Sequence, residues 1–163
     1  MTSLYFEDLQ VGQTWTSNGR TVTEADVVGF AGLSGDFNPI HLDRVATANG
    51  IFGQRVAHGV LGLSIATGLL DSLGLFKRTM GAQLGIDEWR FVAPIFINDT
   101  IHLELSIESL RLTSKGTHGV VKRKLRLINQ DGNVVQEGYI TVLVLSRAAA
   151  EAEAQSPAEQ VGS

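Results

Sequence analysis

The segment 59–74 constrains the fold most, because it is apolar around almost its whole circumference when drawn as a helix. A helix of this kind has to be buried on all sides. Its apolar run stops at Asp71 and is shorter than the roughly 20 residues that a membrane-spanning helix needs. The rest of the chain must therefore wrap this helix. Its apolar positions are Val60, Leu61, Leu63, Ile65, Ala66, Leu69, Leu70 and Leu73.

The second half of the chain shows the period of two that is typical of strands. Apolar and polar side chains alternate strictly over 101–108, which predicts one buried and one solvated face. Related patterns predict strands over 82–94, 121–129 and 134–146, and the Asp-Gly pair within 129–133 predicts a hairpin turn. Consecutive strands separated by turns indicate an antiparallel meander. We therefore expect an α+β fold with the main helix against one face of the sheet.

Two shorter helices are expected before the apolar one. Thr23 and Asp26 form a capping-box pattern at the start of the first, and Gly35 can end it. Asp43 caps the second helix, which should end near Asn49-Gly50. These signals predict helices over 23–35 and 43–50, with an irregular segment between them.

The end of the chain has a different composition from the rest. Residues 147–163 are rich in Ala, Glu, Gln and Ser, and Val161 is their only large apolar side chain. We interpret 147–163 as a solvated, disordered tail with a nascent helix over 148–154. The remaining 1–146 is long enough for a single folded domain.

Composition excludes several classes of function. The net charge of −4 argues against a nucleic-acid surface, which needs a basic patch. The chain has no Cys, so disulfides, thiolate chemistry and Cys-ligated metals are impossible. The first residues lack the basic and apolar regions of a secretory signal. We expect a soluble, cytoplasmic protein without a membrane span.

The stretch "SGDFNPIH" at 34–41 carries the strongest sign of chemistry. Pro39 cannot continue a helix and favours an extended Asn38, so a fixed irregular segment is expected there. Such a segment can turn Asp36 and His41 toward one water, which they would position and with which they would exchange protons. Asn38 could hold the segment or orient a ligand. The alternative is structural, since Asp before Asn-Pro is common in turns and His is often only a hydrogen-bonding residue.

The start of the apolar helix is a second candidate. The first N–H groups of a helix lack internal partners and lie at the positive end of its dipole. Gly59 would let a carbonyl oxygen approach these groups, as in an oxyanion hole. Alternatively, Gly59 only permits close packing, and His58 caps the helix or packs beside it.

The remaining polar residues give weaker signals. His102 and His118 have neither metal-ligand spacing nor a visible third ligand, so no metal site is predicted. The stripe of Lys122, Lys124 and Arg126 is interpreted as a solvated sheet face, with contact to ligand phosphates as the alternative. No glycine-rich phosphate loop is present.

Two linked motifs and a later element resemble a known family. They are "FAGLSGDFNPIHLD" at 30–43, "GQRVAHGVLGLSIATGLL" at 53–70 and the F-x-x-P-x-x-x-x-D element at 91–99. Together they resemble the signature of MaoC-like, (R)-specific enoyl-CoA hydratases and dehydratases. The resemblance implies a hotdog fold, in which an antiparallel sheet wraps a long central helix.

The resemblance also implies a reaction. Asp36 and His41 correspond to the catalytic pair, Gly59 to the N–H donor for the thioester carbonyl, and Asn38 to a residue that supports the site. The implied activity is reversible hydration of a trans-2-enoyl-CoA to the (R)-3-hydroxyacyl-CoA, with no metal or redox cofactor. The CoA or acyl carrier protein arm belongs to the substrate, and a homodimer or larger homo-oligomer is expected.

Two other functions stay open at this point. The same fold serves acyl-CoA thioesterases, in which a carboxylate directs water at the carbonyl carbon. A non-catalytic hotdog subunit that binds acyl thioesters is the other alternative. Phe76, Met80 and Leu84 either line an acyl pocket or belong to the core.

Overall fold

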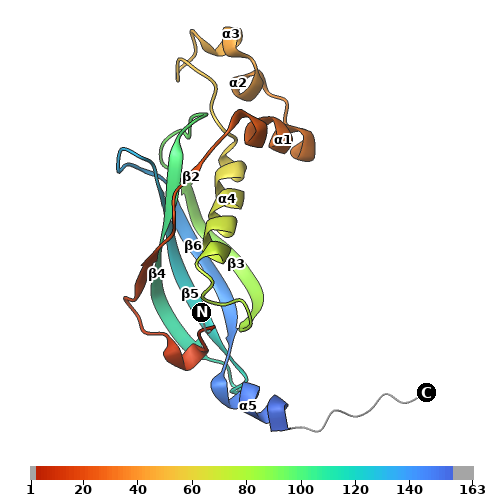
Figure 1. Cartoon of the computed structure of the whole chain (residues 1–163), viewed down its shortest axis with the longest axis vertical. Coiled ribbons are helices and arrows are strands. Elements are labelled where there is room, and N and C mark those ends of the chain that lie inside the picture. Colours follow the sequence, from red (N-terminus) through yellow and green to blue (C-terminus); the bar gives the residue numbers. More distant parts are fainter. Residues whose placement is uncertain (1–2, 156–163) are drawn as a thin grey trace, which may run out of the picture.

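The computed structural model describes residues 3–155 and shows a curved sheet with one helix inside the curve (Figure 1). In chain order the elements are η1 (Phe6–Asp8), β1 (Thr14–Thr16), β2 (Arg20–Thr21), α1 (Glu24–Ser34), α2 (Pro39–Leu42), α3 (Arg44–Thr47), α4 (Gly59–Ser72), β3 (Met80–Phe91), β4 (Thr100–Leu112), β5 (His118–Ile128), β6 (Val134–Leu145) and α5 (Arg147–Gln155).

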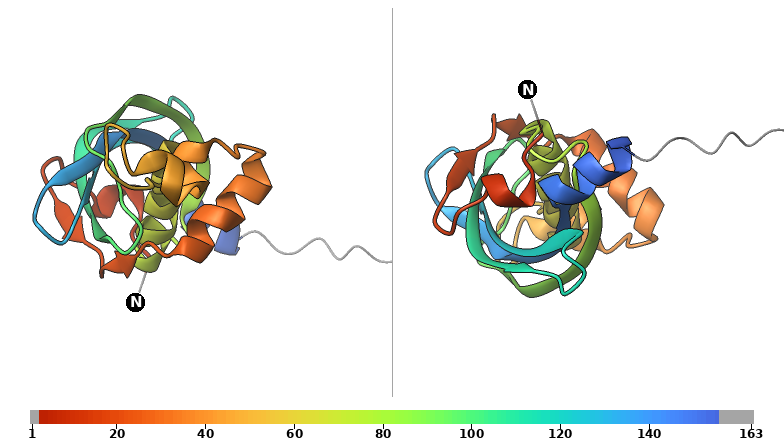
Figure 2. Two further views of the ribbon diagram at one scale, coloured as in Figure 1. Left: turned by 90° about the horizontal axis from the view of Figure 1, so that it is seen from above. Right: turned by 90° about the horizontal axis from the view of Figure 1, so that it is seen from below.

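The sheet confirms the predicted antiparallel arrangement. Its strand order is β1-β4-β5-β6-β3, every pairing is antiparallel, and β2 adds a short pairing to β4. Seen from either end, the strands curve around α4 (Figure 2). The alternation that predicted the strands is visible in their burial, because the inward side chains of β4 are at most 2% exposed. These are Ile101, Leu103, Leu105 and Ile107.

The prediction that the apolar helix is buried on all sides is wrong for the isolated chain. Ile65, Ala66 and Leu69 of α4 are buried among the strands. The opposite side of α4, however, leaves Val60 53% exposed, and Thr67 is exposed as well. The sheet curls around α4 from one side only, so nothing in the described chain covers the other side.

Strand β3 lies next to this uncovered side and forms one edge of the sheet. Most of its side chains are exposed on both faces. Exposed apolar side chains on an unpaired edge strand are a template for pairing with another chain. The exposed apolar side chains of β3 are Met80, Leu84, Ile86 and Phe91, which are 41–58% exposed.

The helix-start signals are confirmed, and the segment between them needs a correction. Thr23 and Asp26 make the capping box of α1, Gly35 ends it in the left-handed conformation, and Asp43 caps α3. The segment expected to be irregular contains the one-turn helix α2. Pro39 occupies its first position, where a missing N–H costs nothing and the fixed φ suits a helix.

The tail prediction is also wrong in part. Residues 147–155 form α5, in agreement with the nascent helix over 148–154, because Ala and Glu are strong helix formers. Arg147 ties the start of α5 to η1 by hydrogen bonds to Glu7 and Asp8. The predicted disorder of 156–163 lies outside the described residues, and the domain boundary at 146 stays a prediction.

Several short elements were not predicted from the sequence, namely η1, β1 and β2. Strands β1 and β2 pair with β4, and η1 packs on β5. None of the helices within 3–155 has the length and apolar character to cross a membrane.

Candidate active site

The segment between α1 and α2 is held by its own side chains. Asp36 Oδ1 accepts a hydrogen bond from the Asn38 N–H, and Asn38 Oδ1 accepts one from the Ile40 N–H. Asn38 is thereby the N-cap of α2 and has the extended conformation expected before proline. These local bonds leave the second carboxylate oxygen of Asp36 free to face His41.

Asp36 and His41 do converge, as the sequence predicted. Asp36 Oδ2 lies 3.8 Å from His41 Nε2. This distance is too long for a direct hydrogen bond but fits one water bonded to both groups. The side chain of Asp36 is 53% exposed and that of His41 only 12%, so solvent reaches the pair from the carboxylate side.

The backbone fixes the tautomer of His41. Its Nδ1 lies 2.7 Å from the carbonyl oxygen of Val56. A carbonyl oxygen only accepts, so Nδ1 must carry the hydrogen in this contact. In the neutral ring the lone pair then lies on Nε2, the atom that faces Asp36. The imidazole is therefore held ready to accept a proton at that position.

His58 supports this pair from behind. It is 3% exposed, and its ring stacks on the His41 ring with 3.7 Å between the centroids. Its Nε2 lies 2.9 Å from the Asp36 carbonyl oxygen and therefore donates to it. His58 occupies the N-cap position of α4 but makes no side-chain capping bond. Of the two structural roles considered for it, packing is confirmed and capping is wrong.

A pocket of about 430 Å³ opens beside His41, and Gly59 contributes to its wall. Gly59 is the first residue of α4, where backbone N–H groups lack helical partners. A side chain there would meet the Phe91 ring, since a Cβ would lie 2.8 Å from it. Gln136 donates to the Gly59 carbonyl oxygen and accepts from the Trp89 indole, which anchors the start of α4 to the sheet.

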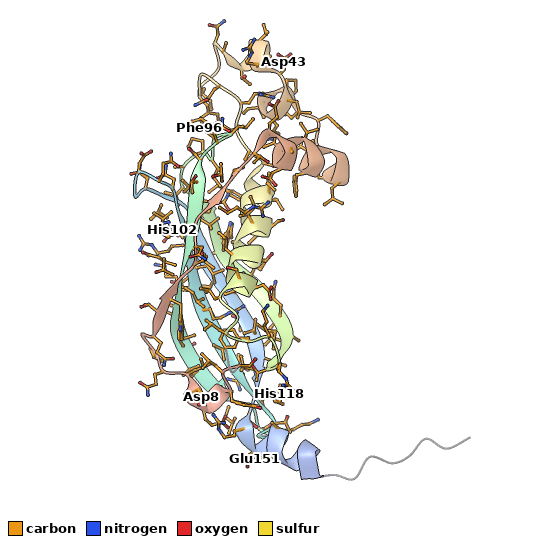
Figure 3. All side chains as sticks on the ribbon, viewed as in Figure 1. Asp8, Asp43, Phe96, His102, His118 and Glu151 are labelled. Atoms are coloured by element: carbon orange, nitrogen blue, oxygen red, sulfur yellow. The ribbon has the colours of Figure 1, made fainter. Side chains whose placement is uncertain are left out.

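The other residues noted in the sequence lie away from this cluster. Figure 3 labels Asp43 at the end of the fold that carries α2 and α3, His102 partway along the sheet and His118 at the opposite end. The stripe of Lys122, Lys124 and Arg126 lies on the outer face of β5 and is partly exposed, which confirms a solvated face. Lys124 pairs with Glu137, and Arg126 with Glu104.

The three apolar residues considered for an acyl pocket have different outcomes. Phe76 and Met80 line a second cavity at the other end of α4. Leu84 is 52% exposed on the edge strand. Phe76 is also buried within the core, so its core role is confirmed and its role in an acyl pocket stays a prediction.

Asp36, His41 and His58 also offer metal-ligand atoms within 4.8 Å of one another. No such group was predicted, because His58 lies far along the chain from the other two. Two of the four ring nitrogens are already used by the backbone carbonyls of Val56 and Asp36. The free nitrogens are His41 Nε2 and the buried His58 Nδ1, which has no hydrogen-bond partner within the described residues.

Comparison with known proteins places the chain in a family. Residues 8–127 match the family model described as the MaoC like domain. The chain is 43% identical over 102 residues to the protein MaoC of Klebsiella aerogenes, covering 63% of this chain but only 30% of that protein. It is 34% identical over 143 residues to an (R)-specific enoyl-CoA hydratase of Rhodospirillum rubrum, covering 88% and 93% of the two chains.

A solved structure supports the fold. A Mycobacterium tuberculosis protein with a double hotdog fold superposes with a TM-score of 0.77, at 22% identity, over 98% of this chain and 47% of that chain. The sheet wrapped around α4 is thus a hotdog fold, as expected. Family model, relatives and fold agree, and the chain belongs to the MaoC-like domain family.

Proposed function

We propose that the protein catalyses the reversible hydration of a trans-2-enoyl-CoA to the (R)-3-hydroxyacyl-CoA. Membership of the MaoC-like family supports a hydratase or dehydratase. The observation that carries the proposal is the 3.8 Å gap between Asp36 Oδ2 and His41 Nε2, beside an apolar pocket that His41 lines. The gap suits one water with an acceptor on each side.

In the proposed mechanism, this water donates one hydrogen bond to the Asp36 carboxylate and one to His41 Nε2. Its lone pair is then directed at the β-carbon of the enoyl group. As the C–O bond forms, one of the two acceptors takes a proton from the water, and that proton is then passed to the α-carbon. The elements of water are added and nothing is oxidised, so the residues themselves supply the acid–base chemistry.

The Gly59 N–H and the start of α4 would stabilise the negative charge that develops on the thioester oxygen. Gly59 carries no side chain, and the Phe91 ring packs in the space that one would take. Asn38 supports the site by capping α2 rather than through a described contact with the pocket. In this proposal, the CoA or carrier protein arm enters with the substrate.

The proposal includes a homodimer in the cytoplasm. The uncovered side of α4 and the apolar edge of β3 lie side by side, and a second copy would cover both. Pairing of two such edges would satisfy the free backbone groups of the strand. Light scattering of the purified protein tests the dimer, and fractionation of the native host tests the location.

The decisive assay follows loss of the conjugated thioester absorbance with a series of trans-2-enoyl-CoAs, with chiral analysis of the product. Asp36→Asn and His41→Ala should each lower kcat by about 10²–10⁴, the usual contribution of acid–base catalysis. Asp43→Asn is the matched control, because Asp43 caps α3 and Asn is an equally good cap. Unchanged turnover in both folded variants would rule the mechanism out, and release of free CoA would indicate a thioesterase instead.

A further inference from the structure

Arg123 breaks the alternation of β5. Side chains of this strand are partly exposed and buried in turn, and the inward neighbours of Arg123, Val121 and Leu125, are fully buried. Arg123 occupies the same inward face and is 1% exposed. A positively charged side chain therefore occupies a position at which the alternation of β5 predicts an apolar one.

Almost no group within residues 3–155 neutralises the charge of this guanidinium or accepts its hydrogen bonds. Its Nε donates one long hydrogen bond, 3.4 Å, to the Ile140 carbonyl oxygen, and a terminal nitrogen is buried without a partner. No described carboxylate forms an ion pair with it. The Phe76 ring lies 5.7 Å away and offers a cation–π contact.

Arg123 nevertheless stays charged at neutral pH. Burial lowers its pKa to about 10, which is still far above neutrality. A buried, unpaired charge is costly, and removing water from it is not repaid by a single weak hydrogen bond. A group of this kind is expected where an anion completes it.

A cavity of about 280 Å³ opens onto Arg123 between α4, β3 and the inner face of the sheet. Its walls are mainly apolar, and they include Leu70, Phe76, Met80 and Val142. Asp71 and Lys77 also line it with opposite charges, so Arg123 supplies the net positive charge. Thr67 adds a hydroxyl whose oxygen can accept, since its hydrogen is donated to Ser64.

This cavity is separate from the pocket beside His41. The two share no lining residue. Gly59 lines the first and Thr67 the second, and the helical rise puts roughly 12 Å between them along α4. The mechanism proposed above does not use Arg123.

We propose that the cavity binds a carboxylate carried on a small, otherwise apolar molecule, with Arg123 as its ion-pair partner. One guanidinium matches one carboxylate, and its planar donors suit the two oxygens. A phosphate would bring more charge than a single cation offsets. The apolar walls suit the remainder of the molecule.

Two kinds of molecule could supply this carboxylate. It is either a free carboxylic acid, or the far end of an enoyl thioester whose acyl chain ends in a carboxylate. The second source rests on the proposed hydratase function, because such a chain would run along α4 from the thioester near Gly59. The first source does not depend on that function.

Binding is tested first without any reaction, by thermal shift and calorimetry with octanoate and, as the matched neutral probe, octanamide. Octanoate should raise the Tm of the wild type, and octanamide should not. Arg123→Met should weaken octanoate binding at least tenfold, while Arg126→Met, on the outer face of the same strand, should not. Arg123→Lys keeps the charge without the planar fork and is the second variant if Arg123→Met does not fold.

Equal effects of octanoate and octanamide, or equal octanoate binding by wild type and Arg123→Met, would overturn the proposal. Light scattering on the same samples covers another outcome. If Arg123→Met separates the protein into monomers and octanoate never binds the wild type, Arg123 pairs with a second copy and the proposal is wrong.

The two sources are separated by kinetics with a pair of enoyl-CoAs of equal length, one ending in a methyl group and one in a carboxylate. If the acyl chain supplies the carboxylate, Arg123→Met lowers the kcat/KM ratio of carboxylated to methyl-ended substrate at least tenfold. If the ligand is a free acid, that ratio stays constant while octanoate binding is lost. Should the wild type hydrate neither substrate, the hydratase proposal fails, and the octanoate result still decides the role of Arg123.

Discussion

Replacing Arg123 with methionine should make the ligand-free protein more stable. The change removes a buried charge that no described side chain neutralises and keeps most of the unbranched stem. The usual expectation for a buried arginine is the reverse, since most core substitutions destabilise. The sign of the effect therefore tests whether the charge is unpaired.

The size of the effect follows from the pKa of Arg123. Burial lowers this pKa to about 10, and the shift corresponds to about 3 kcal/mol of unfavourable free energy for keeping the charge inside the fold. Methionine gives up the Phe76 contact, which is worth about 1–2 kcal/mol. The net gain should be about 1–2 kcal/mol, or a rise in Tm of roughly 2–8 °C for a chain of this size.

The measurement is urea unfolding of wild type and variant, followed by the fluorescence of Trp15 and Trp89, with Arg126→Met as control. Because the pKa of Arg123 in the folded protein is lowered but still near 10, the side chain is protonated in both the folded and the unfolded state at neutral pH. The gain in the free energy of unfolding of Arg123→Met should therefore be constant from about pH 6 to 9. A loss of about 3–5 kcal/mol in Arg123→Met would refute the reasoning, because that is the effect of removing one member of a buried ion pair.

Three further predictions concern the fold and the site. Gly62→Ala should destabilise the protein by about 1–3 kcal/mol in urea unfolding, because its Cβ would collide with the Gln136 amide. Gly68→Ala should stabilise it by about 0.5–1 kcal/mol, because its Cβ would meet nothing within 4 Å. Equal effects of the two substitutions would contradict the packing described. Asp26→Ala should cost about 1 kcal/mol at pH 7, since the Thr23 N–H that bonds its carboxylate holds the pKa of Asp26 below 3.8. The stabilisation is present above that value and fades as the pH falls through the lowered pKa, so the two proteins should converge in acid denaturation; a gap that persists at the lowest pH would argue against this origin. Dialysis against a chelator should leave the hydratase rate unchanged, because His41 Nε2 and Asp36 act on water directly; a rate restored only by added metal would show that these side chains hold an ion instead.

The fold was largely predictable because its signals are local. Strict alternation over 101–108 and the continuous apolar run at 59–74 each specify an element and its buried face. The sequence could not reveal that α4 is covered on one side only, because that depends on how far the sheet curls. Short strands such as β1, which has three residues, carry too little pattern to be recognised.

The candidate site was predictable where neighbouring residues form it and not where distant ones do. Asp36 and His41 lie in one short segment, and Pro39 marks its fixed geometry. The stacking of His58 on His41 and the anchoring of α4 by Gln136 depend on contacts across the fold. Arg123 did give a signal in the sequence, namely a charge at an inward position of β5. It was hidden because charged residues precede and follow it.

The proposed acid and base lie five positions apart, within a segment whose geometry is set by its own turn and cap. The framework of sheet and helix contributes a cavity and one helix start to the chemistry. The residues that build the scaffold and those proposed to react thus lie in separate segments of the chain. Substitutions confined to this short segment could abolish or change the reaction without altering the surrounding fold.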